Sequence, residues 1–228
     1  MNDAVAYHSA IAADFDAKYA ASPAFRERLA VWGELIARHC PDNAEVLDAG
    51  CGSGVLAALA AQRARSLLGF DGSAEMIALA IARVGERANV RFVQASMGDS
   101  AVLDGRSFDL VLSSSVLEYI EDWRGALAWL AAALRPGGIL IFSTPNPASL
   151  YRKAERAAFA LTGRPRYYAH VRSAPSDSEI DAALDVAKLV RVERRYYAPA
   201  PLLSPVARAL GAQRFADTLG VTIARRAQ

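Results

Sequence analysis

The strongest constraint on the fold is a glycine-rich turn that joins a short apolar run to a helix-like stretch. Residues 46–54 read Val-Leu-Asp-Ala-Gly-Cys-Gly-Ser-Gly. Glycine adopts positive φ angles easily and lets the backbone approach a ligand closely. The N-terminus of the helix that follows offers unpaired N–H groups to polar or anionic ligand atoms. This order of elements predicts a ligand site at the carboxyl end of a strand in a parallel α/β sheet.

The rest of the chain alternates strand-like and helix-like stretches, which predicts a doubly wound parallel sheet with helices on both faces. The predicted strands are 44–48, 66–70, 90–94, 108–113, 139–143, 190–197 and 220–225. The predicted helices are 24–39, 55–65, 74–84, 123–134, 149–161, 179–185 and 206–216. The last two strands lack a crossover helix of the earlier kind. We therefore expect a seven-stranded α/β sheet with an antiparallel C-terminal hairpin.

Composition favours a single folded domain over residues 1–228. Hydrophobic residues make up 53% of the chain, enough for a large core, and the formal net charge is only +2. This balance predicts no nucleic-acid partner. Arginines do cluster locally, and we interpret them as a solvated surface. They are Arg164, Arg166, Arg172, Arg191, Arg194 and Arg195.

Nothing in the sequence indicates export or a membrane span. The first 20 residues carry several charges, unlike a signal peptide, and no uncharged apolar run reaches the roughly 18 residues of a transmembrane helix. The two cysteines, Cys40 and Cys51, do not form a CxxC pattern. The three histidines show no metal-ligand spacing. We expect a cytoplasmic protein.

The glycine turn alone does not decide the ligand. Residues 52–57 also fit the relaxed G-x-G-x-x-A form of a nicotinamide-binding turn, and Asp71 lies at a suitable distance downstream for a ribose contact. A nicotinamide-dependent oxidoreductase and a purely structural turn therefore stay open at this point.

Three further blocks follow the turn in order. They are 69–76 (Gly-Phe-Asp-Gly-Ser-Ala-Glu-Met), 108–120 (beginning Phe-Asp-Leu-Val-Leu-Ser) and 134–140 (Leu-Arg-Pro-Gly-Gly-Ile-Leu). Together with the turn they resemble the class I methyltransferases that use S-adenosylmethionine (SAM). A dehydrogenase has no reason to carry the last two blocks. The resemblance covers residues 44–145 and implies a Rossmann-like fold with SAM as cofactor.

The resemblance also implies roles for individual residues. Asp48 is expected near the methionine ammonium group of SAM, and Asp71 is expected to accept hydrogen bonds from both ribose hydroxyls, since a carboxylate has two acceptor oxygens. The remaining expected cofactor-binding residues are Gly50, Cys51, Gly52 and Gly54 of the turn, Gly72 and Met76 nearby, Ser96 and Met97 beside the adenine, and Ser113 and Ser114 after the fourth strand.

Residues 1–40 resemble the N-terminal lid helices of the methyltransferase family, with Phe15 and Asp16 at the family's usual aromatic–acid position. The stretch from Phe142 to Glu179 resembles the ubiquinone-biosynthesis O-methyltransferase branch, which carries an insertion after the fifth strand. This resemblance implies that residues 145–178 form a substrate lid or contact a membrane surface. Metal-assisted members carry Glu and His where this chain has Ser115 and Tyr119. Glu118 alone is a poor divalent site, so we predict no catalytic metal.

The predicted reaction is methyl transfer to a small-molecule acceptor, at an oxygen of a quinone precursor or a secondary metabolite. Enzymes of this kind mainly align the two reactants in a site shielded from water. His170 is the predicted general base, because its ordinary pKa lies near neutrality, and Tyr119 is predicted to contact the acceptor. The alternatives are a non-catalytic SAM-binding module and a nicotinamide-dependent oxidoreductase.

Overall fold

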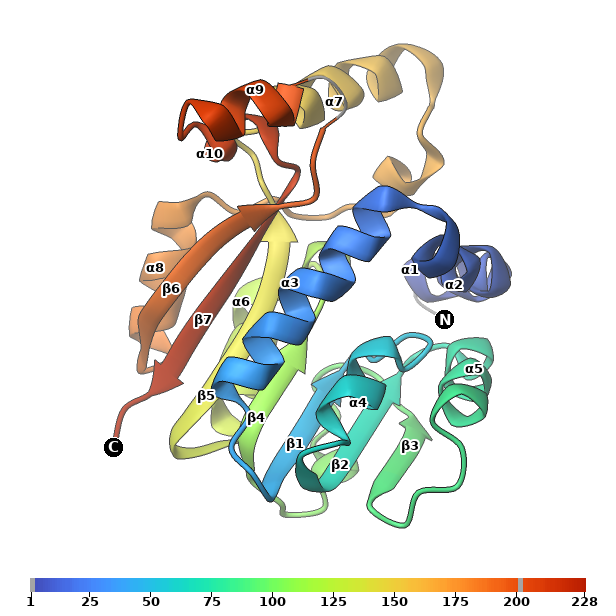
Figure 1. The fold of residues 1–228 in the computed structure, drawn as a ribbon, viewed down its shortest axis with the longest axis vertical. Coiled ribbons are helices and arrows are strands. Elements are labelled where there is room, and N and C mark those ends of the chain that lie inside the picture. Colours follow the sequence, from blue (N-terminus) through green and yellow to red (C-terminus); the bar gives the residue numbers. More distant parts are fainter. Residues whose placement is uncertain (1–2, 201–202) are drawn as a thin grey trace.

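A computed structural model describes residues 3–200 and 203–228, which form a three-layer α/β fold. Its seven-stranded sheet has the order β3-β2-β1-β4-β5-β7-β6, and β7 runs antiparallel to both of its neighbours (Figure 1). The strands are β1 (Ala44–Ala49), β2 (Ala64–Asp71), β3 (Val90–Gln94), β4 (Phe108–Ser113), β5 (Leu134–Pro145), β6 (Leu189–Tyr197) and β7 (Leu219–Arg226). The predicted doubly wound sheet with an antiparallel C-terminal pair is confirmed.

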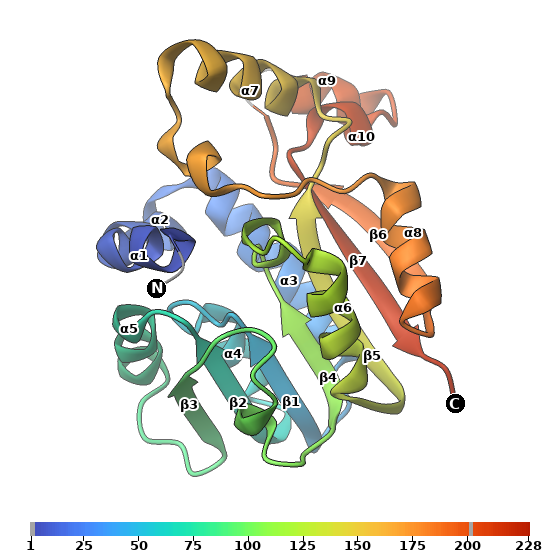
Figure 2. The same ribbon diagram turned by 180° about the vertical axis from the view of Figure 1, so that it is seen from behind.

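Helices cover both faces of this sheet, so its central strands are apolar on both sides. Side chains alternate between the two cores: Val46 packs in the cluster of Trp32 from α3 (Pro23–His39), and the adjacent Leu47 packs in the cluster of Leu127 from α6 (Trp123–Ala132). The first face also carries α4 (Val55–Ala60), and the second carries α8 (Asp177–Val186) (Figures 1 and 2). α5 (Ala74–Val84) lies beside β3.

The remaining helices gather beyond the carboxyl ends of the parallel strands. α1 (Asp3–Ala10) and α2 (Ala12–Ala21) lie above the β1–β3 half, and α7 (Leu150–Thr162) lies beyond β5 (Figure 1). The other elements are α9 (Leu203–Ala209), α10 (Gln213–Ala216) and the 3₁₀ turns η1 (Ser100–Leu103), η2 (Leu117–Tyr119) and η3 (Arg166–His170). Of these, α1, α2, α7 and η3 contribute residues to the sheet edge where ligands bind in open α/β folds.

Some element boundaries differ from the sequence prediction, either because strands pair earlier than expected or because a glycine interrupts a helix. The predicted helix 55–65 ends at Ala60, because Ala64 already pairs with Ala44 of β1. β5 begins five residues before the predicted Ile139, since Leu134 pairs with Phe108 ahead of an irregularity in the register. The predicted helix 206–216 divides into α9 and α10, with Gly211 in a left-handed conformation (φ +67°) between them.

Within residues 3–200 and 203–228, no helix combines the length and the apolar character needed to cross a membrane.

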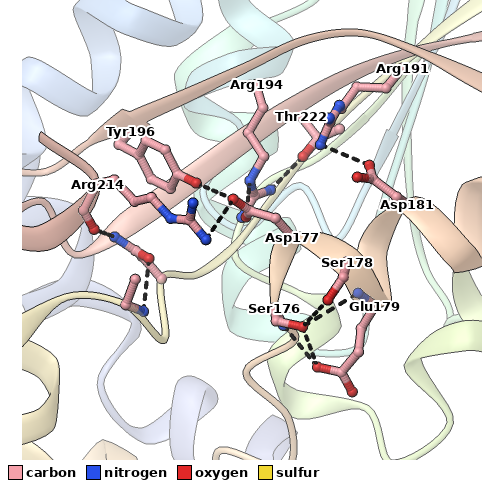
Figure 3. Close-up of polar contacts among 12 residues, drawn as sticks. Ser176, Asp177, Ser178, Glu179, Asp181, Arg191, Arg194, Tyr196, Arg214 and Thr222 are labelled. Atoms are coloured by element: carbon pink, nitrogen blue, oxygen red, sulfur yellow. Dashed lines mark hydrogen bonds and ion pairs between the residues drawn. The ribbon is translucent and has the colours of Figure 1, made fainter. Parts of the chain in front are cut away.

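The clustered arginines mostly have carboxylate partners. Figure 3 shows Asp177 at the centre of one group, with Arg194 Nε 2.7 Å and Arg214 Nη2 3.6 Å from its two carboxylate oxygens. Tyr196 donates its hydroxyl hydrogen to the same carboxylate. Nearby, Arg191 Nη1 lies 2.7 Å from Asp181. These contacts tie α8 to the edge strand β6, so Arg191 and Arg194 are not simply part of a solvated face.

Gly54 offers a test of how tightly the turn packs. Gly54 (φ +74°) and Gly163 (φ +68°) share the left-handed conformation, but an added Cβ meets Ala80 Cα at 2.9 Å at Gly54 and nothing within 4 Å at Gly163. We expect Gly163→Ala to cost about 1–2 kcal/mol of unfolding free energy from backbone strain. We expect Gly54→Ala to cost about 1–3 kcal/mol more, because Ala80 must move. Urea unfolding of both variants measures the difference, and equal losses would contradict the close packing.

Candidate active site

A cavity of about 520 Å³ opens at the carboxyl ends of the central strands. Its floor is made by the residues that follow β1, β2 and β4, and its cover comes from α1, α2, α3, η2, α7 and η3. This volume is in the range of small-molecule and cofactor pockets, about 300–1,000 Å³. The chain reverses its direction of strand addition between β1 and β4, so the cavity lies at the topological switch point of the sheet.

The glycine turn is pulled against β2 by backbone hydrogen bonds. The N–H groups of Gly50 and Cys51 both donate to the Phe70 carbonyl, at 2.8 and 2.9 Å. Gly50 has φ +74°, and an added Cβ would lie 2.4 Å from Val116 Cγ2. Only glycine fits this position, because the backbone conformation and the close approach of Val116 both exclude a side chain.

Asp71 ends β2 and braces two loops. Its Oδ2 accepts the Gly52 N–H at 2.9 Å, and its Oδ1 accepts the Ser73 N–H at 2.9 Å. Burial raises the pKa of Asp71, while these backbone hydrogen bonds partly oppose the shift. Its carboxylate faces the cavity with acceptor capacity beyond the two bonds, since each oxygen can accept two hydrogens.

An acidic and a basic side chain, Asp48 and Arg28, are both buried in the lining of this cavity. Asp48 is only 1% exposed, and its Oδ2 has no hydrogen-bond partner among the described residues. Burial, with the nearby Asp71 charge, raises the pKa of Asp48 to about 7. Arg28 of α3 donates from Nη2 to Ser114 Oγ at 2.7 Å, while its buried Nε has no partner in the described part of the chain.

These groups fit the charged parts of SAM. An unpartnered carboxyl suits an ammonium group, an unpartnered guanidinium N–H suits a carboxylate, and Asp71 suits a pair of ribose hydroxyls. Buried polar groups without partners are costly, so a ligand that supplies partners gains from the site. The residues present therefore match a ligand with an amino-acid end and a ribose.

The cavity brings together most of the residues that the sequence singled out. Its lining includes Asp48, Gly50, Cys51, Gly52, Asp71, Gly72, Met76, Ser96, Met97, Ser114 and Tyr119. Gly54, Ser113 and His170 are not part of the lining. Gly54 packs on Ala80 behind the turn, and Ser113 is fully buried within β4.

His170 lies between the two covering segments. Its ring stacks on Tyr7 with the centroids 4.5 Å apart, and Nδ1 is 3.1 Å from Asp3 Oδ2. Arg172 adds a weaker contact to the same carboxylate at 3.7 Å. His170 therefore links η3 to α1 and does not line the cavity.

Sequence reasoning missed several lining residues on the covering helices. Besides Arg28, the lining includes His8, Lys18, Tyr19, Phe25, Arg152 and Tyr167. Burial, followed by the charges of His170 and Arg28, lowers the pKa of His8 to about 4, so this ring is neutral near pH 7. No local motif marks these positions, because only the docking of the helices brings them to the cavity.

Glu118 and Tyr119 of η2 also line the cavity. Glu118 is 3% exposed and its Oε2 has no hydrogen-bond partner among the described residues. Burial raises the pKa of Glu118 to about 7 and also raises the pKa of Tyr119, so the phenol keeps its proton. Within the described residues, no group of three or more His, Cys, Asp or Glu side chains could hold a metal ion.

The N-terminal cover is anchored directly to the glycine turn. Asp16 Oδ1 accepts hydrogen bonds from Ser53 Oγ and from Arg83 Nη2, both at 2.5 Å. Arg83 Nε also donates to the Ser53 carbonyl at 2.9 Å. The aromatic neighbour Phe15 lines the cavity, so the aromatic–acid pair combines a wall residue with an anchor.

Comparisons with known proteins identify the family of this chain. Residues 20–187 match the family described as a methyltransferase domain. The fold and the cavity are those of a class I SAM-dependent methyltransferase, and the chain belongs to this methyltransferase family. Membership removes the nicotinamide-dependent oxidoreductase that the glycine turn had left open.

Curated relatives match over part of their length. Trans-aconitate 2-methyltransferase of Deinococcus radiodurans is 43% identical over 104 residues, which cover 45% of this chain and 38% of that protein. Ubiquinone biosynthesis O-methyltransferase is 29% identical in Vibrio parahaemolyticus, over 59% of this chain and 56% of that protein. The Hahella chejuensis protein of that name is 30% identical, over 69% and 68%. The chain spans about half the length of most of these relatives.

Solved structures share the fold at low sequence identity. The N-methyltransferase NodS of Bradyrhizobium japonicum, in complex with S-adenosylhomocysteine (SAH), has a TM-score of 0.63 at 21% identity, over 90% of this chain and 89% of that one. Magnesium protoporphyrin IX methyltransferase of Synechocystis, with bound SAH, has a TM-score of 0.66 at 18% identity, over 88% and 84%.

The raised pKa of Glu118 predicts a pH-dependent stability. Between its ordinary value of 4.5 and about 7, the folded protein binds more protons at this carboxyl than the unfolded chain does. Stability must therefore fall as the pH rises through this window. We expect Glu118→Gln to remove a decline on the order of 1–3 kcal/mol, measured by urea unfolding between pH 4.5 and 7.5. Glu121→Gln, at an exposed neighbour, is the control, and an unchanged slope in Glu118→Gln would contradict the assignment.

Proposed function

We propose that this chain transfers the methyl group of SAM to an oxygen atom of a small molecule, either a quinone precursor or a secondary metabolite. The observation that carries the proposal is the single cavity in which the groups suited to SAM face a wall with an unpartnered buried carboxyl, Glu118. Two of the curated relatives are O-methyltransferases by name, which supports oxygen as the acceptor atom.

In this proposal the cofactor lies along the carboxyl ends of β1 and β2. Asp48 pairs with the ammonium group, Arg28 with the carboxylate, and Asp71 with the ribose hydroxyls. Met76, Ser96 and Met97 flank the adenine, and the glycine turn lets the backbone pass close beneath the ligand. An ammonium group beside Asp48 would also restore the ionised form of this carboxyl, whose pKa is raised by burial.

Glu118 replaces His170 as our proposed proton acceptor. When bound, SAM supplies an electrophilic methyl group on a positively charged sulfur. Glu118 takes the proton that the acceptor hydroxyl loses as its oxygen is methylated, and a carboxyl with a pKa of about 7 suits this role near neutral pH. Tyr119 keeps its own proton and can donate a hydrogen bond that orients the acceptor.

The two covers are proposed to exclude water together. The N-terminal segment 1–40, of which residues 1–2 lie outside the described structure, and the insertion 145–178 meet through the Tyr7–His170 stack. Enclosure strengthens electrostatic contacts inside the site and protects the methyl donor from side reactions. We propose that one cover moves to admit the acceptor, as lids do in other enzymes.

A peripheral membrane contact through 145–178 is a second proposal. Within this segment Leu150 is 56% exposed and Leu161 is 87% exposed. Apolar side chains beside basic ones suit the surface of an anionic bilayer. Co-sedimentation with phosphatidylglycerol vesicles would test it, and full recovery of the protein in the supernatant would contradict it.

Titration calorimetry with SAH tests the cofactor site. We expect micromolar binding, with NADH showing none, and Asp71→Asn should weaken the affinity about 10- to 100-fold because one ribose hydroxyl loses its acceptor. Asp185→Asn, at an exposed position on α8, is the matched control.

Two results would count against the proposal. Binding of NADH but not SAH would contradict the cofactor assignment. Tight SAH binding without methyl transfer to any member of a broad acceptor panel would favour a non-catalytic SAM-binding module.

A further inference from the structure

The insertion 145–178 is fastened to the wall that carries Glu118. The Glu118 carbonyl accepts the N–H groups of Arg172 at 2.7 Å and Ser173 at 3.2 Å. Ser173 Oγ also donates to the Leu117 carbonyl at 3.3 Å. These bonds fix the end of the insertion on η2, so the residues that α7 and η3 contribute to the cavity stand beside Glu118 and Tyr119.

Arg152 is the cation that this insertion brings into the cavity. It lies in the first turn of α7 and lines the cavity. Its Nε donates to the Thr218 carbonyl at 2.5 Å, and its own carbonyl accepts the Tyr168 hydroxyl at 3.2 Å. The first contact holds the guanidinium at Nε, and the second holds the main chain of α7 against η3.

No carboxylate of residues 3–200 and 203–228 forms an ion pair with Arg152. This distinguishes it from Arg191, Arg194 and Arg208, each of which pairs with an Asp or Glu outside the cavity. Burial acts to lower the pKa of Arg152, but Tyr167, Tyr168 and Glu118 raise it overall, so the guanidinium stays charged. A buried guanidinium with no carboxylate in direct contact is stabilised further by an anionic ligand that pairs with it.

The cavity lining near Arg152 includes aromatic side chains. Tyr167 lines the cavity and stacks on Tyr168 with the ring centroids 4.6 Å apart, and Tyr168 stacks in turn on Phe159 at 5.8 Å. Tyr119 forms part of the same lining. Aromatic faces favour a planar occupant.

We propose that the methyl acceptor is a planar molecule bearing a carboxylate, and that Arg152 selects it by pairing with that carboxylate. Arginine is suited to this role because its planar fork can donate two parallel hydrogen bonds to the two oxygens. A hydroxyl elsewhere on the same molecule then faces Glu118. This assignment rests on the proposed function and narrows its acceptor to a hydroxy acid.

The test is calorimetric binding of two probes to protein saturated with SAH. The probes are 3,4-dihydroxybenzoate and catechol, which differ by one carboxylate. We expect the acid to bind at least about ten-fold more tightly than catechol, and Arg152→Met to abolish this preference while leaving SAH affinity unchanged. Arg152→Lys should retain part of it, since lysine keeps the charge and loses the fork. Arg156→Met, on an exposed position of the same helix, should behave as the unmodified protein.

The outcomes separate the two levels of the proposal. Failure of the unmodified protein to bind SAH overturns the proposed function itself. Normal SAH binding with equal affinity for the two probes, or a preference that survives Arg152→Met, overturns only the selection by Arg152. If Arg152→Met does not fold, the Arg152→Lys and Arg156→Met pair decides, because equal preferences in those two proteins also overturn it.

Discussion

The hydrogen bonds from Gly50 and Cys51 to the Phe70 carbonyl hold the end of β1 against the end of β2, and the site is built on this contact. They place the turn where Asp71 can reach the Gly52 N–H, so one carboxylate braces the loop after each strand. The same turn leaves room for Val116 from the β4 side. A side chain at Gly50 would displace these neighbours together, which is why the turn tolerates only glycine there.

Around this fixed floor the cavity is completed by segments that are distant in sequence. The N-terminal cover is held by Asp16 on Ser53 and Arg83, and the insertion is held by Arg172 and Ser173 on Glu118. The two covers then meet at His170. Each cover has its own anchor on the sheet edge, and the contact at His170 links the two.

The cavity lining contains buried acidic and basic side chains that have few partners of their own. Asp48 and Glu118 are buried carboxyls with pKa values raised to about 7, and Arg28 and Arg152 are cations with few partners of their own. Such groups are stable in a folded protein only at a cost in free energy, which ligands with complementary charge can offset. The arrangement favours a cofactor and an acceptor that bring charges of both signs.

The sequence by itself determined the sheet, the glycine turn and the floor of the site. Strand-and-helix periodicity and the turn at 46–54 are local patterns, and the resemblance to class I methyltransferases rests on short sequence blocks that contain Asp48, Asp71 and Met76. All three residues line the cavity. Tertiary structure alone decided the cover. Arg28, His8 and Arg152 reach the cavity from helices whose docking depends on contacts across the whole fold. Tertiary contacts also decided the position of His170, which pairs with Asp3 and Tyr7 and does not line the cavity. These partners lie about 160 residues away in the chain, so no local sequence pattern could predict the contact.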